Sequence, residues 1–207
     1  MTEKTATARF GAGKITMVDR LIDEVSGPVR RARQEASHTL TSMLADDPNA
    51  LGDKLPAVAE AMVDALFRPE AQTRWEALDA LRYIADVDPT LVEDSYEGAE
   101  ASLFDENNSR VRVSAFCLIA RMGSKSPDAA EKAWPLLDEA IQCYHGDLGY
   151  RDMLAGMLEF VQGEASDEIK SALAERIRFD AENGRGFFKE RSAESIAIVD
   201  GKEVSSL

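Results

Sequence analysis

A repeat of about 40 residues is the feature that most restricts the fold of this chain. Four arginines follow one another at steps of 41, 38 and 39 residues: Arg33, Arg74, Arg112 and Arg151. Each is followed seven residues later by an aliphatic residue, namely Leu40, Leu81, Ile119 and Leu158. A period near 40 is typical of stacked helical hairpins, because each hairpin buries its apolar face only against its neighbours. The sequence therefore predicts an array of helical hairpins.

A second pattern supports the same period. Apolar residues recur at three- and four-residue steps along nearly the whole chain, which is the helical period. An Asp or Ser followed by Pro is a helix-start signal, and it recurs in register with the arginines, at Asp47-Pro48, Asp88-Pro89 and Ser126-Pro127. The helices that pair with the arginine helices are expected at 53–67, 90–104, 127–144 and 166–182.

The two ends of the chain differ from the repeat. We expect residues 1–12 to be a flexible N-terminal segment, 13–199 to be a single domain of about five hairpins, and 200–207 to be a flexible tail. In the last hairpin Lys189 takes the arginine position. The Asp200-Gly201 pair is also compatible with a β-hairpin turn, although a helix followed by a tail is the preferred interpretation.

The distribution of charge restricts the possible partners. The net charge is −14, and residues 35–182 hold 13 Lys/Arg against 30 Asp/Glu. An acidic surface repels phosphate groups, so no nucleic acid is expected as a partner, whereas a basic protein or peptide is compatible with it. No run approaches the ~20 apolar residues of a membrane helix, and the segment from Met1 to Arg9 lacks the apolar stretch of a signal peptide. We therefore expect a cytoplasmic protein that is not inserted in a membrane.

The third repeat unit resembles a known family. It reads Asp105-Glu106-Asn107-Asn108-Ser109-Arg110-Val111-Arg112, followed by Ala115 and Ile119. An acidic turn, then Val-Arg, then Ala and an aliphatic residue on one helix face resembles the HEAT repeat. The closest subtype is the HEAT-like repeat named after phycobilisome lyases. The resemblance implies an all-α fold, a right-handed α-solenoid of about five HEAT-like helical hairpins, and says little about function.

The same resemblance implies a structural role for the four arginines. In such repeats the arginine bonds an acidic residue or a carbonyl of a neighbouring turn, so Arg33, Arg74, Arg112 and Arg151 would form a ladder between repeats. Asp105 or Glu106 is the acid expected for Arg112, and the second unit offers Glu70 instead. The Val that precedes the arginine in the family pattern occurs here only as Val111.

Helical geometry separates a core side from an outward side in each arginine helix. If the aliphatic position marks the core, the residues six before, two before and two after it point away from the core at ~100° per residue. By the resemblance, these helices line the concave face of the superhelix, the usual binding surface of solenoids. These outward positions, called the stripe below, are Gln34, His38, Ser42, Trp75, Asp79, Tyr83, Val113, Cys117, Arg121, Asp152, Gly156 and Phe160.

The stripe is a candidate partner-binding surface. Aromatic residues and arginines dominate the energetics of protein interfaces. The partner contacts are expected from the stripe and its neighbour Arg82, at Trp75, Asp79, Arg82, Tyr83, Arg121 and Phe160. Packing is the alternative that stays open, because concave helices crowd together and Val113 and Cys117 indicate partial burial.

No residue pattern indicates catalysis, a metal site or a cofactor. His38 and His145 are the only histidines and fall on different hairpins, so their spacing predicts no zinc site. Cys117 and Cys143 are the only cysteines, and both lie in apolar helical patterns, which favours reduced core residues. We predict a non-catalytic scaffold or adaptor, without a cofactor, that binds a protein or peptide through its concave face.

Two other functions remain compatible with the sequence. HEAT-like arrays include DNA glycosylases and bilin lyases, and Trp75 with Asp79 would supply a stacking aromatic and a catalytic acid. A glycosylase requires a basic channel for phosphate contacts, which the acidic middle of the chain opposes. End-to-end self-association is the other alternative, and the oligomeric state stays open.

Overall fold

The computed structural model describes residues 16–201, so the predictions made for residues 1–12 and 202–207 lie outside it. The described part is all-α and contains no strand. Its α-helices are α1 (Met17–Ser26), α2 (Arg30–Asp46), α3 (Leu55–Ala65), α4 (Ala71–Val87), α5 (Tyr96–Leu103), α6 (Ser109–Gly123), α7 (Pro127–Tyr144), α8 (Tyr150–Gln162), α9 (Asp167–Asn183) and α10 (Phe187–Val199). Two 3₁₀ helices precede α3 and α5, namely η1 (Gly52–Lys54) and η2 (Pro89–Ser95). The five predicted hairpins and the right-handed α-solenoid are confirmed.

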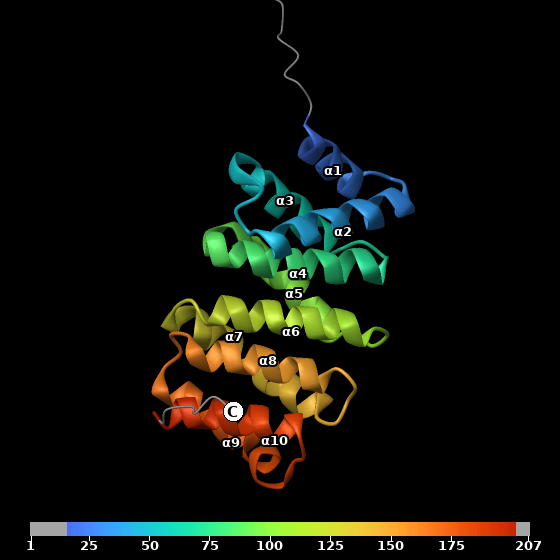
Figure 1. Cartoon of the computed structure of the whole chain (residues 1–207). Coiled ribbons are helices and arrows are strands. Elements are labelled where there is room, and N and C mark those ends of the chain that lie inside the picture. The colour runs from blue at the N-terminus through green and yellow to red at the C-terminus, as the bar shows by residue number, and fades with distance from the viewer. Residues whose placement is uncertain (1–15, 202–207) are drawn as a thin grey trace, which may run out of the picture.

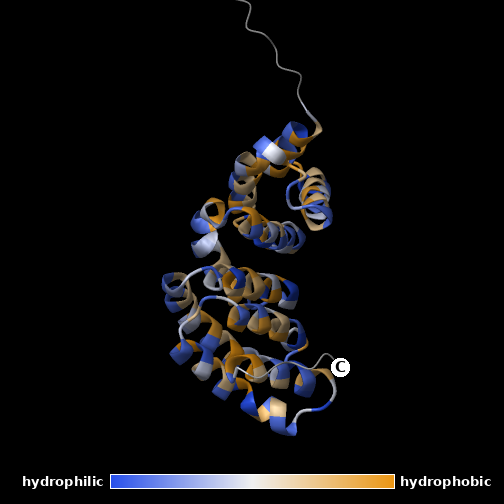
Figure 2. Cartoon of the chain, turned by 60° about the vertical axis from the view of Figure 1, so that its left-hand side comes forward, coloured by the Kyte–Doolittle hydropathy of each residue, from blue (hydrophilic) through white to orange (hydrophobic). Residues whose placement is uncertain are grey.

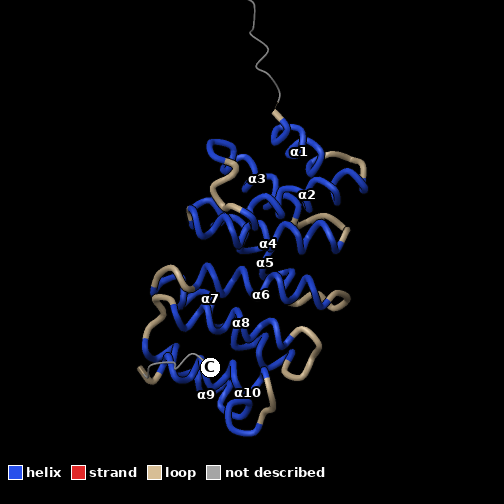
Figure 3. The backbone as a smooth tube through the Cα atoms, in the orientation of Figure 1, coloured by secondary structure: helices blue, strands red, loops and turns tan. Residues whose placement is uncertain are grey.

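The hairpins stack in one direction to form two layers. In Figure 1, α2, α4, α6, α8 and α10 follow one another down the array, and these even-numbered helices pack on each successive neighbour. The odd-numbered helices form the second layer, and they contact one another less extensively. Because the more tightly packed layer has the shorter arc, the even-numbered helices form the concave side. Figure 3 shows the loops that join the helices along the two sides of the stack.

The core lies between the two layers. Apolar residues of each hairpin face inward and form one continuous cluster from α1 to α9. Figure 2, which shows many helices nearly end-on, has hydrophobic segments between the layers. Leu40, Leu81 and Ile119, three of the four aliphatic residues at the repeat position, are fully buried, whereas Leu158 is half-buried. No helix of the described part is both long and apolar enough to cross a membrane.

The expected helix-start signals hold in two of three places. Ser126 of α7 and Asp88 of η2 each accept a hydrogen bond from a backbone amide of the first turn, which satisfies one of the free donors there. Asp47 does not begin a helix. Its carboxylate accepts a bond from the amide of Asn49 within a turn, and the chain enters η1 only at Gly52.

The C-terminal end of the array is a helix, which was the preferred interpretation over a β-hairpin turn. Helix α10 continues to Val199, and the amide of Gly201 donates to the carbonyl of Ile198. Gly201 has a φ of +66°, a conformation that glycine adopts without strain at a helix end. Asp200 and Gly201 therefore end a helix and do not form a β-hairpin turn.

Candidate functional site

The first arginine of the ladder is buried in an ion pair between repeats. The Arg33 guanidinium is held by both carboxylate oxygens of Glu70, in the turn before α4, and it also donates to the carbonyl of Gly27 at 2.9 Å. Arg33 is 7% exposed and Glu70 8%. The hydrogen bond from Arg33 holds the pKa of Glu70 below its usual value, against the effect of burial. The arginine of one repeat thus bonds the acid of the next repeat.

The second and third arginines of the ladder, each called a rung below, also bond the acid of the next repeat, and one expected pairing is corrected. Arg74 pairs with the Asp105 carboxylate at 2.7 Å, whereas Arg112 donates to the backbone carbonyl of Asp105 at 2.8 Å. The carboxylate partner of Arg112 is Asp147, one repeat further along, at 3.4 Å. Asp105 is therefore the acid of Arg74 and was wrongly expected to give its carboxylate to Arg112.

The fourth rung has a different chemistry. The Arg151 guanidinium lies 4.5 Å from the centre of the Phe187 ring at the start of α10. No ion pair of Arg151 occurs in the described residues. A cation over a ring contributes roughly 0.5–1 kcal/mol at an exposed site, so the last contact of the ladder is weaker than the first.

The N-terminal half of the stripe lies on the open concave side. Trp75, Asp79 and Tyr83 are half-buried on α4, as is the adjacent Arg82. The two aromatics pack partly on the core and keep part of their surface exposed, so packing and exposure both occur. On α2, Gln34 and His38 line a shallow hollow with Arg31, Glu35 and Gln72.

The C-terminal half of the stripe is largely closed. Phe160, expected among the partner contacts, is fully buried and stacks on Trp134 of α7, with ring centres 6.4 Å apart. Its ring is therefore not available to a partner on the concave face. Val113 and Cys117 are also buried. At Gly156 a Cβ would lie 3.1 Å from the Phe116 ring, so the glycine favours the close packing of α8 on α6 at this point.

Ion pairs between helices cover much of the concave side. Asp79 of α4 accepts from Arg110 of α6 at 2.8 Å. Arg121 of α6 pairs with Asp86 of α4, which Lys125 also contacts at 2.9 Å. The carboxylate of Asp79 is thus paired with the Arg110 guanidinium.

A further ion pair crosses the concave face over two repeats. Arg82 Nη2 of α4 donates to Glu159 Oε1 of α8 at 2.6 Å, although α6 lies between these helices. Burial disfavours the charged form of Arg82, but the Glu159 carboxylate outweighs this effect and raises the pKa of Arg82. Cys117 is buried close to this bridge, and burial raises the pKa of its thiol to about 12. The thiol is therefore protonated at neutral pH and is not a nucleophile.

The side chains of the types that bind metal ions lie apart from one another in the described part of the chain. Within residues 16–201, no group of three or more His, Cys, Asp or Glu side chains lies close enough to hold an ion. Both cysteines are free, but Cys143 is exposed, contrary to the expectation of a core residue. His145 contacts Asp180 at 3.0 Å, and Tyr150 donates to the same carboxylate at 2.8 Å.

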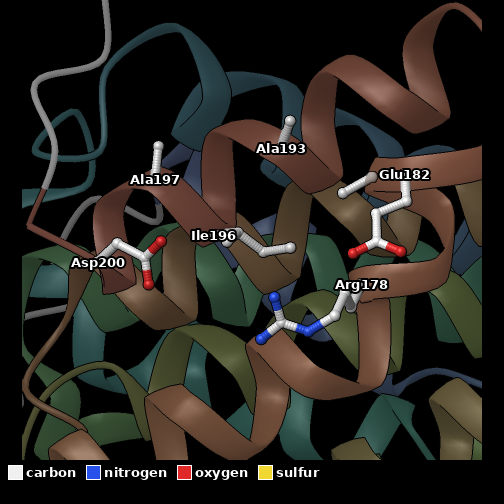
Figure 4. Close-up of a pocket in the computed structure, with 7 residues that line it drawn as sticks. Arg178, Glu182, Ala193, Ile196, Ala197 and Asp200 are labelled. Atoms are coloured by element: carbon white, nitrogen blue, oxygen red, sulfur yellow. The ribbon is translucent and has the colours of Figure 1, made fainter.

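Shallow hollows occur beside the stripe and at the end of the array. Between α6 and α8, one is lined by stripe residues Val113 and Asp152 and by Leu148, which is 97% exposed. Between α9 and α10, another lies at the C-terminal end (Figure 4). Figure 4 shows Arg178 and Glu182 of α9 opposite Ile196 of α10. This hollow is open and has about 270 Å³, less than the ~300–1,000 Å³ of typical small-molecule sites.

Comparison with known proteins bears on the fold. No family model matches the chain, and no curated protein matches it. The designed armadillo repeat protein YIII(Dq)4CqI is 13% identical with a TM-score of 0.72, over 89% of this chain and 82% of that one. Another, designed armadillo repeat protein YIII(Dq.V1)4CPAF in complex with peptide (KR)4, is 13% identical with a TM-score of 0.71, over 86% and 80%. An engineered protein is 17% identical with a TM-score of 0.73, over 89% and 79%.

These likenesses show the class of fold. At 13–17% identity they show an α-solenoid built of helical repeats, and they show no activity. The fold therefore defines a helical repeat protein.

Proposed function

We propose that this protein is a non-catalytic adaptor whose concave face, along α2, α4, α6 and α8, binds an extended segment of a basic protein or peptide. The observation that carries the proposal is the open part of the stripe. Trp75 and Tyr83 keep exposed surface beside the carboxylate of Asp79. Half-exposed aromatic rings next to charged groups are the residue types that contribute most to protein interfaces.

The repeat geometry and the charge support this proposal. An extended segment laid along the stack meets a new helix at each repeat, so its side chains would be read one helix at a time. The net charge of −14 favours a basic segment and raises its association rate. A structural neighbour with a TM-score of 0.71 was solved with the peptide (KR)4. We also propose that the repeats are of the HEAT-like type named after phycobilisome lyases, on the basis of the turn before Arg112.

Trp75 provides a direct test of where a partner binds. The chain has two tryptophans, so a Trp134→Phe variant leaves Trp75 as the only one. We expect an octapeptide of alternating Lys and Arg to shift the emission maximum of Trp75 in a saturable way. The Tyr83→Ala change should weaken binding about tenfold, because an interface aromatic contributes more than 1 kcal/mol.

A matched control separates the concave face from the rest of the surface. Tyr96 lies on the outer layer, where its hydroxyl donates to the carbonyl of Lys132. Tyr96→Ala should change the affinity by less than about twofold, since substitutions away from the site have small effects. Peptide binding that leaves the Trp75 emission unchanged, or that Tyr83→Ala does not weaken, would contradict the proposal.

A further inference from the structure

The bridge between Arg82 and Glu159 differs from the other ion pairs between repeats. In the described residues, those other pairs join neighbouring hairpins, at sequence separations of 31–39 residues. Arg82 and Glu159 are 77 residues apart, and their side chains meet over the face of α6. Because the guanidinium and the carboxylate meet across α6, the bridge lies in the path of a segment that binds over the C-terminal halves of α4 and α8.

The bridge also leaves one hydrogen-bond acceptor unused. Arg82 bonds Oε1 of Glu159, whereas Oε2 is buried and has no hydrogen-bond partner within residues 16–201. A carboxylate accepts two parallel bonds from an arginine that faces it squarely. A buried oxygen without a donor costs free energy, and more so when it carries charge. Glu159 can therefore accept a further hydrogen bond, which Arg82 does not supply.

We propose that Glu159 is the residue that binds an arginine or lysine side chain of the basic partner, and that Arg82 is an internal occupant which this side chain displaces. The proposal rests on the function proposed above and specifies its chemistry. When an incoming guanidinium replaces that of Arg82, Glu159 keeps its charge compensated and its Oε2 gains a donor. Arg82 then turns to solvent, where a guanidinium is well hydrated.

The position of the bridge fits this role. Arg82 is next to Tyr83, and its guanidinium carbon lies 6.0 Å from the centre of that ring. The bridge lies near the C-terminal ends of α4 and α8, on the same part of the concave side as Tyr83. A segment that packs on the exposed surface of Tyr83 would therefore reach the bridge, and a basic side chain of that segment would meet Glu159.

The test is the affinity of the labelled Lys-Arg octapeptide, measured by fluorescence anisotropy. Arg82→Met removes the internal occupant and keeps an apolar stem, so the affinity should rise about tenfold. Glu159→Gln should lower the affinity of the wild-type chain about tenfold. In the double variant, Arg82→Met should give no gain, because its effect acts only through Glu159.

Arg176→Met is the matched control. Arg176 pairs with Asp138 on the outer layer at 2.6 and 3.0 Å. Like Arg82→Met, this change removes one positive charge and leaves one carboxylate without its arginine, but it does so away from the concave face. Its effect should stay within about twofold. As a second measurement, the peptide should raise the melting temperature of Arg82→Met more than that of the wild type, because a tighter ligand stabilises the folded state more.

The outcomes distinguish this inference from the function on which it rests. Equal gains for Arg82→Met and Arg176→Met would overturn the inference, since net charge alone would then act. A gain that persists in the double variant would overturn it as well. If the peptide shifts Trp75 emission but neither Arg82→Met nor Glu159→Gln changes its affinity, the concave face binds without this exchange. If no variant responds at Trp75, the proposed function fails together with the inference.

Discussion

Replacement of Glu70 by Gln is expected to lower the free energy of unfolding by about 3 kcal/mol, because breaking one side of a buried ion pair leaves the other charge uncompensated. The Arg33 guanidinium is buried, and in the described part of the chain its one other hydrogen-bond partner is the Gly27 carbonyl. Gln keeps the shape of the side chain and one acceptor, so the loss reflects the charge. Urea denaturation followed by circular dichroism measures it.

The third rung of the ladder provides the control. Asp147 pairs with Arg112 at 3.4 Å, and its side chain is 50% exposed. Exposed pairs contribute about 0–1 kcal/mol, so Asp147→Asn should cost less than about 1 kcal/mol. Equal losses for the two variants would show that burial does not decide how much each ion pair of the ladder stabilises the fold.

The ion pair between Arg33 and Glu70 predicts that the free energy of unfolding depends on pH. Since the pKa of Glu70 is lowered in the folded chain, the carboxylate binds fewer protons there than in the unfolded chain. Its stabilisation is complete above the pKa of an unfolded glutamate, about 4.3, and is lost as the pH falls through the lower folded value. The difference in stability between wild type and Glu70→Gln should therefore shrink below about pH 4. A difference that is constant down to pH 3 would contradict this.

Phe160→Ala should cost about 3–5 kcal/mol, the range for removing a large buried aromatic side chain. The ring is fully buried against Trp134, and it also fills the space next to Gly123. The surrounding helices are held by their own repeats and close only partly around the gap. The change in unfolding free energy, measured with urea, tests the value.

Tyr83→Ala tests whether Tyr83 contributes less to the stability of the fold than the buried Phe160 does. Tyr83 occupies the same place in its repeat as Phe160 but is only half-buried. We expect a loss of about 1 kcal/mol for Tyr83→Ala, because most of the cost of such a change scales with the buried surface. A loss as large as that of Phe160→Ala would mean that Tyr83 is a packing residue and not a site residue.

The period of the sequence was enough to predict the architecture. Each expected helix overlaps a helical segment of the structure, because helix-start signals and apolar spacing are local features that neighbouring hairpins reinforce. Burial of Phe160 was not predictable from the repeat. The same position holds Ser42, Tyr83 and Arg121 in other units, and only the nearby Gly123 suggests that a ring is accommodated there.

The partners of charged side chains were harder to predict. Spacing shows that Asp105 and Arg112 are close, but not that Arg33, Arg74 and Arg112 each take the carboxylate of the next repeat. The bridge from Arg82 to Glu159 depends on how strongly the whole array curves, and curvature adds up over several repeats. The cytoplasmic location stays a prediction, since it depends on surroundings that the chain alone does not fix.

The contact across two repeats also has a mechanical consequence. Stretching a superhelix moves every second helix of the concave layer apart, which loads the bond from Arg82 to Glu159 in tension. The other ion pairs between repeats in the described residues join adjacent hairpins, so each of them spans a single interface. The middle of this solenoid should therefore resist extension more than its ends do. A ligand that displaces Arg82 would break this contact and make the middle of the solenoid easier to extend. Ligand binding and the resistance to extension would then depend on the same side chain.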